Sequence, residues 1–160
     1  MKLSKGTIGI IAAVVVIAMW AASAYNKMVG EQENATTALA NVQSAYQRRA
    51  DLIPNLVETV KGYAEHEKGT FEAVVNARAK ATQITLDPTN LTPEKLQEFQ
   101  KAQGELGSAL GRLIAVQENY PDLKVNENFK DLQVQLEGTE NRINEARNKF
   151  NAVVQQYNVV

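Results

Sequence analysis

The sequence predicts an all-α protein in which one N-terminal transmembrane helix precedes an antiparallel four-helix bundle of long helices. Three observations support this fold class: an uncharged apolar segment near the N-terminus, apolar residues that recur every three or four positions afterwards, and no strand-like alternation. Hydrophobic residues make up 44% of the 160 residues and charged residues 22%, which is typical of a folded chain. We expect a cytoplasmic N-terminus at 1–6, a transmembrane helix at 7–25 and a helical domain at 26–160.

The apolar segment runs from Thr7 to Ala24 and contains no charged residue. As a helix it spans about 27 Å at a rise of 1.5 Å per residue, close to the thickness of a bilayer's hydrocarbon core. The tripeptide Ala22-Ser23-Ala24 also fits a signal-peptide cleavage site. However, the segment is longer than the apolar core of about 7–15 residues found in signal peptides. We therefore expect an uncleaved anchor.

Small residues within this anchor are candidates for packing against a second transmembrane helix. Gly6, Gly9 and Ala13 recur at helical spacing, and small residues let helix backbones approach closely inside a membrane. Glycine and alanine are also common in transmembrane helices that do not associate. The sequence leaves both interpretations open.

Charge asymmetry predicts the orientation of the chain in the membrane. Lys2 and Lys5 precede the anchor, whereas Lys27 is soon followed by Glu31 and Glu33. The positive-inside rule then places the N-terminus in the cytoplasm and the helical domain outside it. Without the first two lysines, 15 lysine and arginine residues face 18 acidic ones, so the domain lacks the basic surface of a nucleic-acid binder. The chain has no cysteine, which excludes disulfides, thiolate metal sites and cysteine nucleophiles.

Apolar periodicity places the helices of the domain at about 29–49, 52–84, 93–119 and 124–158. Pro54 interrupts the first apolar stripe because proline offers no N–H to the carbonyl four residues earlier. We expect the helix to break there, with Asp51 as the N-cap of the next one. The unbroken phase of the stripe supports an alternative, a three-helix bundle whose first helix is long and kinked at Pro54.

Two features of the predicted bundle suggest how its helices meet. Gly104, Gly107 and Gly111 lie inside the third helix, where each glycine costs about 1 kcal/mol relative to alanine. We expect close contact with a neighbouring helix to offset that cost. Arg49 lies within an apolar stripe, so its guanidinium should be partly buried and need an acidic partner. The candidate partners are Glu58, Glu118 and Glu140.

Two long blocks of the sequence resemble the LemA family. The first is QRRADLIPNLVETVKGYAEHE at 47–67, and the second begins with ENYPDLK at 118–124 and continues through TENRI at 139–143 to the YN pair at 157–158. The resemblance covers nearly the whole chain. It implies a bacterial protein with an N-terminal transmembrane helix and a four-helix bundle, without established enzymatic activity. Members of the family include a component of magnetosome membranes, and they usually continue past the YN pair with an aromatic segment.

The residues themselves offer little catalytic chemistry. His66 is the single histidine, and no carboxylate or second imidazole stands at helical ligand spacing from it, so we interpret it as a surface or capping residue. The glycines lie within a helix and do not follow a strand, as a phosphate-binding loop requires. No serine has the context of an activated nucleophile. We expect no enzymatic activity, no catalytic residues, no cofactor and no bound metal.

The resulting hypothesis is a non-enzymatic scaffold in the bacterial inner (cytoplasmic) membrane. Its expected partners are the lipid bilayer, further copies of itself and a protein that the sequence does not identify, but not nucleic acid. The alternative is a sensor or adaptor acting on a membrane protease or kinase, which needs a pocket on the glycine-lined face. The candidate interaction residues lie at two junctions: Arg48, Arg49, Asp51 and Pro54, and then Glu118, Asn119, Tyr120 and Pro121.

Overall fold

The structure, a computed structural model, describes residues 5–63 and 67–157, and these residues form helices without any strand. The expected all-α class is therefore confirmed, whereas Lys2 and His66 lie outside the described residues. The elements, in order, are α1 (Lys5–Lys61), α2 (Lys68–Gln83), the short 3₁₀ helix η1 (Pro88–Asn90), α3 (Pro93–Ala115), the 3₁₀ helix η2 (Val116–Asn119), α4 (Pro121–Val125) and α5 (Glu127–Tyr157).

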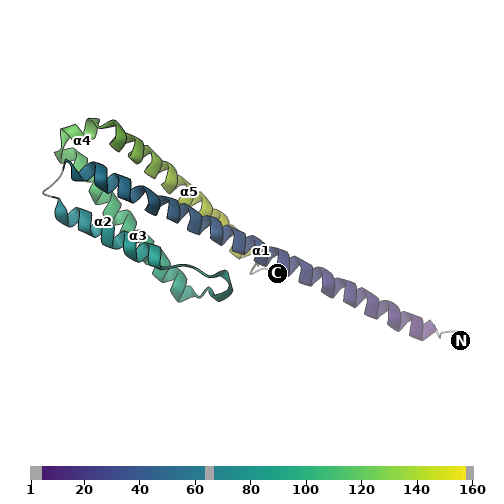
Figure 1. The fold of residues 1–160 in the computed structure, drawn as a ribbon. Coiled ribbons are helices and arrows are strands. Elements are labelled where there is room, and N and C mark those ends of the chain that lie inside the picture. Colours follow the sequence, from purple (N-terminus) through teal and green to yellow (C-terminus); the bar gives the residue numbers. More distant parts are fainter. Residues whose placement is uncertain (1–4, 64–66, 158–160) are drawn as a thin grey trace.

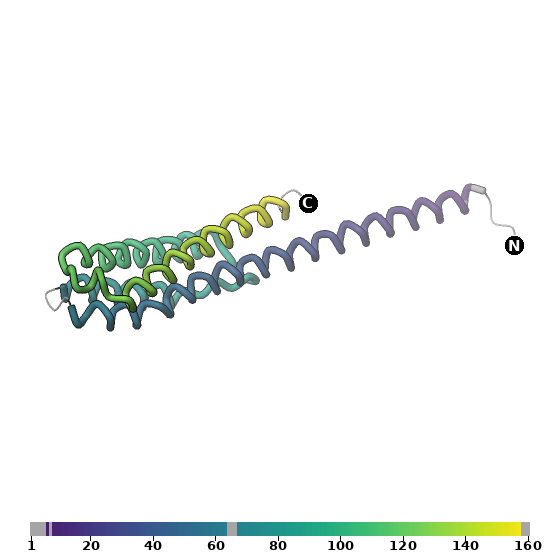
Figure 2. The backbone as a smooth tube through the Cα atoms, turned by 90° about the horizontal axis from the view of Figure 1, so that it is seen from above, coloured from purple at the N-terminus to yellow at the C-terminus, as the bar shows by residue number. Residues whose placement is uncertain are grey.

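Helix α1 dominates the shape of the molecule, because its N-terminal half projects alone beyond all the other helices (Figure 1). Its C-terminal half packs mainly against α5 and also touches α2, which in turn packs against α3. Helix α5 runs back along α1, so the C-terminus lies beside the middle of α1 (Figures 1 and 2). The α2–α3 connection points towards the same end, and α4 lies at the far end.

The expected helix break near Asp51 is wrong, because α1 continues through Pro54 to Lys61. Proline cannot donate to the carbonyl oxygen of Ala50, four residues earlier, and Ala50 is only 3% exposed. In the fold, Arg78 of α2 supplies the missing donor: its Nε lies 2.9 Å from the Ala50 oxygen. The long-first-helix alternative thus describes α1 better, and the expected helix at 52–84 is divided instead between Lys61 and Lys68.

We expect the contribution of Arg78 to the free energy of unfolding to depend on whether Pro54 is present. Replacing Arg78 with methionine should cost about 1–3 kcal/mol of unfolding free energy, because a buried carbonyl loses its partner. The Pro54→Ala chain regains a backbone N–H for Ala50, so the same Arg78→Met change should cost clearly less there. Urea unfolding of the four chains of this double-mutant cycle measures the difference. Equal costs in both backgrounds would contradict the proposed compensation.

Side-chain caps mark the starts of η1 and α3. The Thr92 hydroxyl accepts a hydrogen bond from the Lys95 N–H at 3.3 Å, which confirms the expected start of α3. The expected helix at 93–119 ends as α3 at Ala115 and tightens into η2. Asp87 accepts hydrogen bonds from the hydroxyl and the N–H of Thr89, and both bonds lower the pKa of Asp87 below its ordinary value of 3.8.

The core consists of two hydrophobic clusters stacked along the bundle axis. The cluster nearer the projecting helix includes Leu39, Tyr46 and Phe99, and the far cluster includes Leu56 and Phe129. Three buried residues of the described chain are polar or charged, and along its own helix each lies between residues of the two clusters. These residues are Arg49 of α1, Gln103 of α3 and Thr139 of α5. We call these three residues the polar layer.

Candidate functional site

Arg49 is the centre of the polar layer. Its side chain is 4% exposed, as its position within an apolar stripe of the sequence predicts. Nη1 donates to Oε1 of Glu140 at 2.8 Å, and Nη2 donates to both the backbone oxygen and Oε1 of Gln103, each at 2.8 Å. The guanidinium carbon also lies 5.1 Å from the ring centroid of Tyr46, within the range of a cation–π contact. Nε is buried and has no hydrogen-bond partner among the described residues.

Gln103 extends this network to the remaining long helix. Its Nε2 donates to the backbone oxygen of Ala81 in α2 at 3.3 Å. Arg49 and Gln103 together therefore connect α1, α2, α3 and α5 at one level of the domain. The hydrogen bonds of this polar layer form only when the helices share one register, because shifting any helix would leave further buried polar groups unpaired.

The structure selects one of the three acidic partners that the sequence allowed for Arg49. Glu140 forms the ion pair, whereas Glu58 is exposed and Glu118 pairs with Lys124 at 3.3 Å. Sequence reasoning missed Gln103. The sequence pattern could have indicated its burial, because Gln103 lies at helical spacing between the apolar Phe99 and Leu106, which are buried in α3.

The first predicted group of interaction residues is divided between the core and the surface. Arg49 faces inward, whereas Arg48, Asp51 and Pro54 are exposed. Successive residues of a helix point about 100° apart, so Arg48 lies on the surface although the adjacent Arg49 is buried. Asp51 accepts a hydrogen bond from Gln47 at 2.8 Å on the surface of α1. Arg48 lines a shallow hollow with charged residues of α5, among them Glu145 and Lys149.

The second predicted group forms the turn at the end of the domain far from the projecting helix. Glu118 and Asn119 end η2, Pro121 begins α4, and Tyr120 between them packs partly against the far core cluster. The turn adjoins the end of α1, where the Tyr63 hydroxyl lies 2.7 Å from Nδ2 of Asn126. The two predicted groups are thus placed apart, and no single site unites them.

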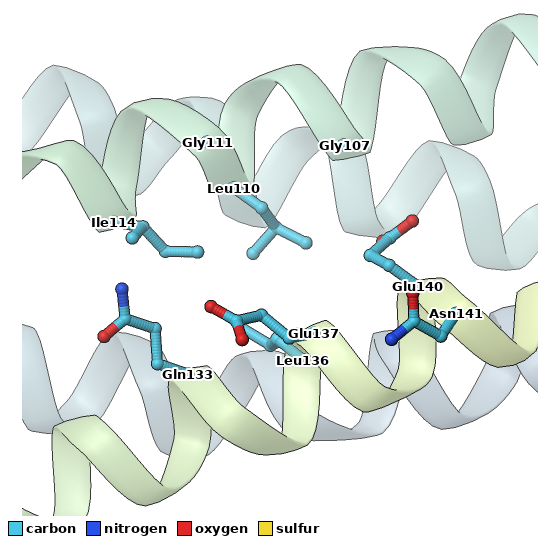
Figure 3. A pocket seen from close by; sticks show the side chains of 9 residues that line it. All are labelled: Gly107, Leu110, Gly111, Ile114, Gln133, Leu136, Glu137, Glu140 and Asn141. Atoms are coloured by element: carbon cyan, nitrogen blue, oxygen red, sulfur yellow. The ribbon is translucent and has the colours of Figure 1, made fainter.

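The expected packing of all three α3 glycines against a neighbour is wrong. A Cβ built on Gly104 or Gly111 would meet no atom of the described residues within 4 Å, and one on Gly107 would lie 3.5 Å from Nη1 of Arg49. Two of these glycines instead line a groove of about 540 Å³ between α3 and α5 (Figure 3). The lining residues are Gly107, Leu110, Gly111 and Ile114 of α3, with Gln133, Leu136, Glu137, Glu140 and Asn141 of α5.

The projecting half of α1 exposes a continuous set of large apolar side chains. They include Ile8, Ile11, Ile17 and Trp20, each at least half exposed, and nothing in the described chain covers them. Within the described residues, α1 is the one helix long and apolar enough to cross a membrane. Gly9 has open space around it among the described residues, as packing against a second helix requires.

No group of three histidine, cysteine, aspartate or glutamate side chains in the described part of the chain is arranged to hold a metal ion. The features assembled in this structure are therefore a helical domain, an apolar N-terminal helix, a buried arginine network and an open groove. Together they define the class of a helical-bundle protein with a candidate N-terminal membrane anchor.

Comparison with known proteins identifies the family. The LemA family model matches residues 38–160, so the chain belongs to the LemA family. The chain is 29% identical over 152 residues to the magnetosome protein MamQ of Magnetospirillum gryphiswaldense, an alignment that covers 84% of this chain and 56% of MamQ. It is 24% identical over 133 residues to protein LemA of Metamycoplasma hominis, which covers 83% of this chain and 57% of that protein. The chain thus spans little more than half the length of these relatives.

Proposed function

We propose that this protein is a non-enzymatic, single-pass membrane scaffold whose helical domain, an antiparallel four-helix bundle, binds protein partners and copies of itself. The observation that carries the proposal is the continuity of α1 from the apolar segment to Lys61. Anchor and domain share one helix, so they form a rod without a hinge. The end of α5 reaches Gln32, because Tyr157 and Gln32 line the same hollow. Gln32 lies roughly 10 Å along α1 from Tyr25, the last residue of the expected transmembrane helix, at 1.5 Å per residue. The end of α5 would therefore lie close to the membrane surface.

The uncovered apolar side chains of α1 support a membrane location for the scaffold. A contiguous apolar surface of this extent is unfavourable in water and favourable in hydrocarbon. The lysines before the segment support an N-terminus in the cytoplasm and a domain on the other side of the bacterial inner membrane. The MamQ relatives are named as magnetosome proteins, and this name supports a membrane location for the chain.

Cysteine cross-linking in membranes tests self-association, because the natural chain contains no cysteine. Ala13→Cys lies on the same helix face as Gly9, whereas Ile11→Cys lies about 160° away around the helix. We expect oxidation to convert Ala13→Cys into a species of twice the 17.6 kDa chain mass, and Ile11→Cys to remain largely uncoupled.

Mass measurement of the detergent-solubilised chain over a range of concentrations complements the cross-linking. A strict monomer at high concentration, together with no cross-link at either cysteine, would contradict self-association. Equal coupling at both positions would contradict the small-residue face as the contact surface.

The groove between α3 and α5 favours a second function, a sensor or adaptor. In this role, ligand binding in the groove would change how the protein acts on a membrane protease or kinase. Such a role requires that an occupant change the spacing of the two helices. Spin labels at Gly104→Cys and Glu145→Cys, one on each helix, would report that spacing. An unchanged label distance in the presence of a bound occupant would leave the scaffold role alone.

A further inference from the structure

The groove lies between two long helices, α3 and α5, that do not pack closely against each other. Helices α1 and α5 pack together, as do α2 and α3, whereas α3 and α5 lie across an opening from each other. In Figure 3, Leu110 and Ile114 of α3 face Gln133 and Leu136 of α5 across this opening. Each wall extends for about two helical turns, or roughly 11 Å, along the bundle axis.

The α3 wall of the groove lacks side chains where they would narrow it. Gly107 and Gly111 are one helical turn apart, and a Cβ on Gly111 would meet no atom within 4 Å in the described part of the chain. Packing within the chain therefore does not explain why glycine occupies position 111. Small residues four positions apart allow a second helix to bring its backbone close to the first. The two glycines thus leave room suited to a helix lying lengthwise in the groove.

The α3 side of the lining is apolar, whereas the α5 side combines one leucine with amides and two carboxylates. The half-buried Ile114 and the edges of the buried Leu110 and Leu136 supply the apolar surface, while Glu137 and Glu140 supply carboxylates. Among the described residues, no lysine or arginine lines the groove. Glu140 is paired with Arg49, but Glu137 belongs to none of the ion pairs of the described residues. The lining therefore favours an occupant with aliphatic side chains and a positive charge.

We propose that this groove binds one helical segment of a partner protein, with aliphatic side chains against α3 and a lysine or arginine against Glu137. Helices α3 and α5, which line the groove, run roughly along the direction of α1 (Figure 1), so a partner helix that rises from the same membrane would approach the groove lengthwise. The inference rests on the proposed interaction role and names the surface that performs it.

A designed peptide tests the groove without knowledge of the natural partner. The probe is a labelled, two-heptad amphipathic peptide of leucine and lysine, and the comparison peptide carries glutamate at every lysine position. Both are titrated, with fluorescence anisotropy as the readout, against the full chain in nanodiscs of zwitterionic phosphatidylcholine and against empty nanodiscs. We expect saturable binding of the basic peptide to the chain and at least about tenfold weaker binding of the acidic one.

Matched variants separate binding of the peptide in the groove from non-specific attraction of the peptide to the rest of the protein surface. Gly111→Leu fills the groove, whereas Gly104→Leu makes the same change on the same helix outside it. Both should raise the unfolding midpoint, because leucine is a better helix former than glycine. Binding of the basic peptide should weaken about tenfold or more in Gly111→Leu and in Glu137→Lys, and less than about twofold in Gly104→Leu and in Glu145→Lys.

Three results would overturn the proposal. They are undiminished peptide binding by Gly111→Leu, equal binding of the acidic peptide, and no saturable binding of the basic peptide. If Gly111→Leu instead abolishes self-association while the peptide does not bind, a second copy of the chain occupies the groove and the proposed partner is wrong. The cross-linking at Ala13 is independent of the groove, so failure here leaves that test of the scaffold role intact.

Discussion

Replacing Arg49 with alanine should lower the free energy of unfolding of the helical domain by about 3 kcal/mol. The change removes the donor shared by Glu140 and the two oxygens of Gln103, all at 2.8 Å. Loss of a partner costs most where the remaining group stays buried, and Gln103 is 6% exposed. The side chain of Glu140 is 47% exposed and regains water, so we expect the lower end of the range for broken buried ion pairs.

Urea unfolding of the full chain in detergent, followed by circular dichroism, measures this effect. Arg48→Ala is the matched control, because it removes the same side chain one residue away on the exposed surface. It should change stability by less than about 0.5 kcal/mol. Arg49→Met keeps much of the side-chain volume and separates lost packing from lost hydrogen bonds. An Arg49→Ala chain as stable as the Arg48→Ala chain would show that the polar layer does not stabilise the fold.

Two arginines placed in the middle of the apolar segment should detach the chain from the membrane. Val14→Arg and Ile17→Arg together cost about 5–7 kcal/mol of insertion free energy, at about 2.5–3.5 kcal/mol for each arginine near the centre of the bilayer. We expect the double variant to move from the carbonate-resistant membrane pellet to the soluble fraction. Thr37→Arg with Ala40→Arg is the control, since it introduces the same charges at the same spacing on exposed positions outside the segment.

The same membranes report the orientation of the chain. A single cysteine at the exposed position Ser44 should react with a membrane-impermeant maleimide added to intact cells, if the domain lies outside the cytoplasm. Labelling that requires cell lysis would reverse the proposed orientation. Retention of the Val14→Arg, Ile17→Arg chain in the carbonate pellet would show that the segment alone does not anchor the protein.

Local sequence was sufficient for several features of this protein. The uncharged run from Thr7 to Ala24 identifies the candidate membrane helix, because length and composition alone decide whether a helix matches a bilayer. Thr92 followed by Pro93 identifies the start of α3 for a similar reason, since a cap acts within one turn. The burial of Arg49 follows from its place in an apolar stripe. These features depend on residues within a few positions of each other.

Contacts distant in sequence decided the rest. Pro54 predicts a helix break when considered alone, but Arg78 donates to the carbonyl that Pro54 leaves unpaired. The choice of Glu140 as the partner of Arg49 depends on which face of α5 meets α1, 91 residues away. Gly111 is compatible with tight packing or with open space until α3 and α5 are placed in three dimensions. Helix periodicity specifies which residues face inward, whereas only the tertiary structure decides which inward faces meet and which are left open.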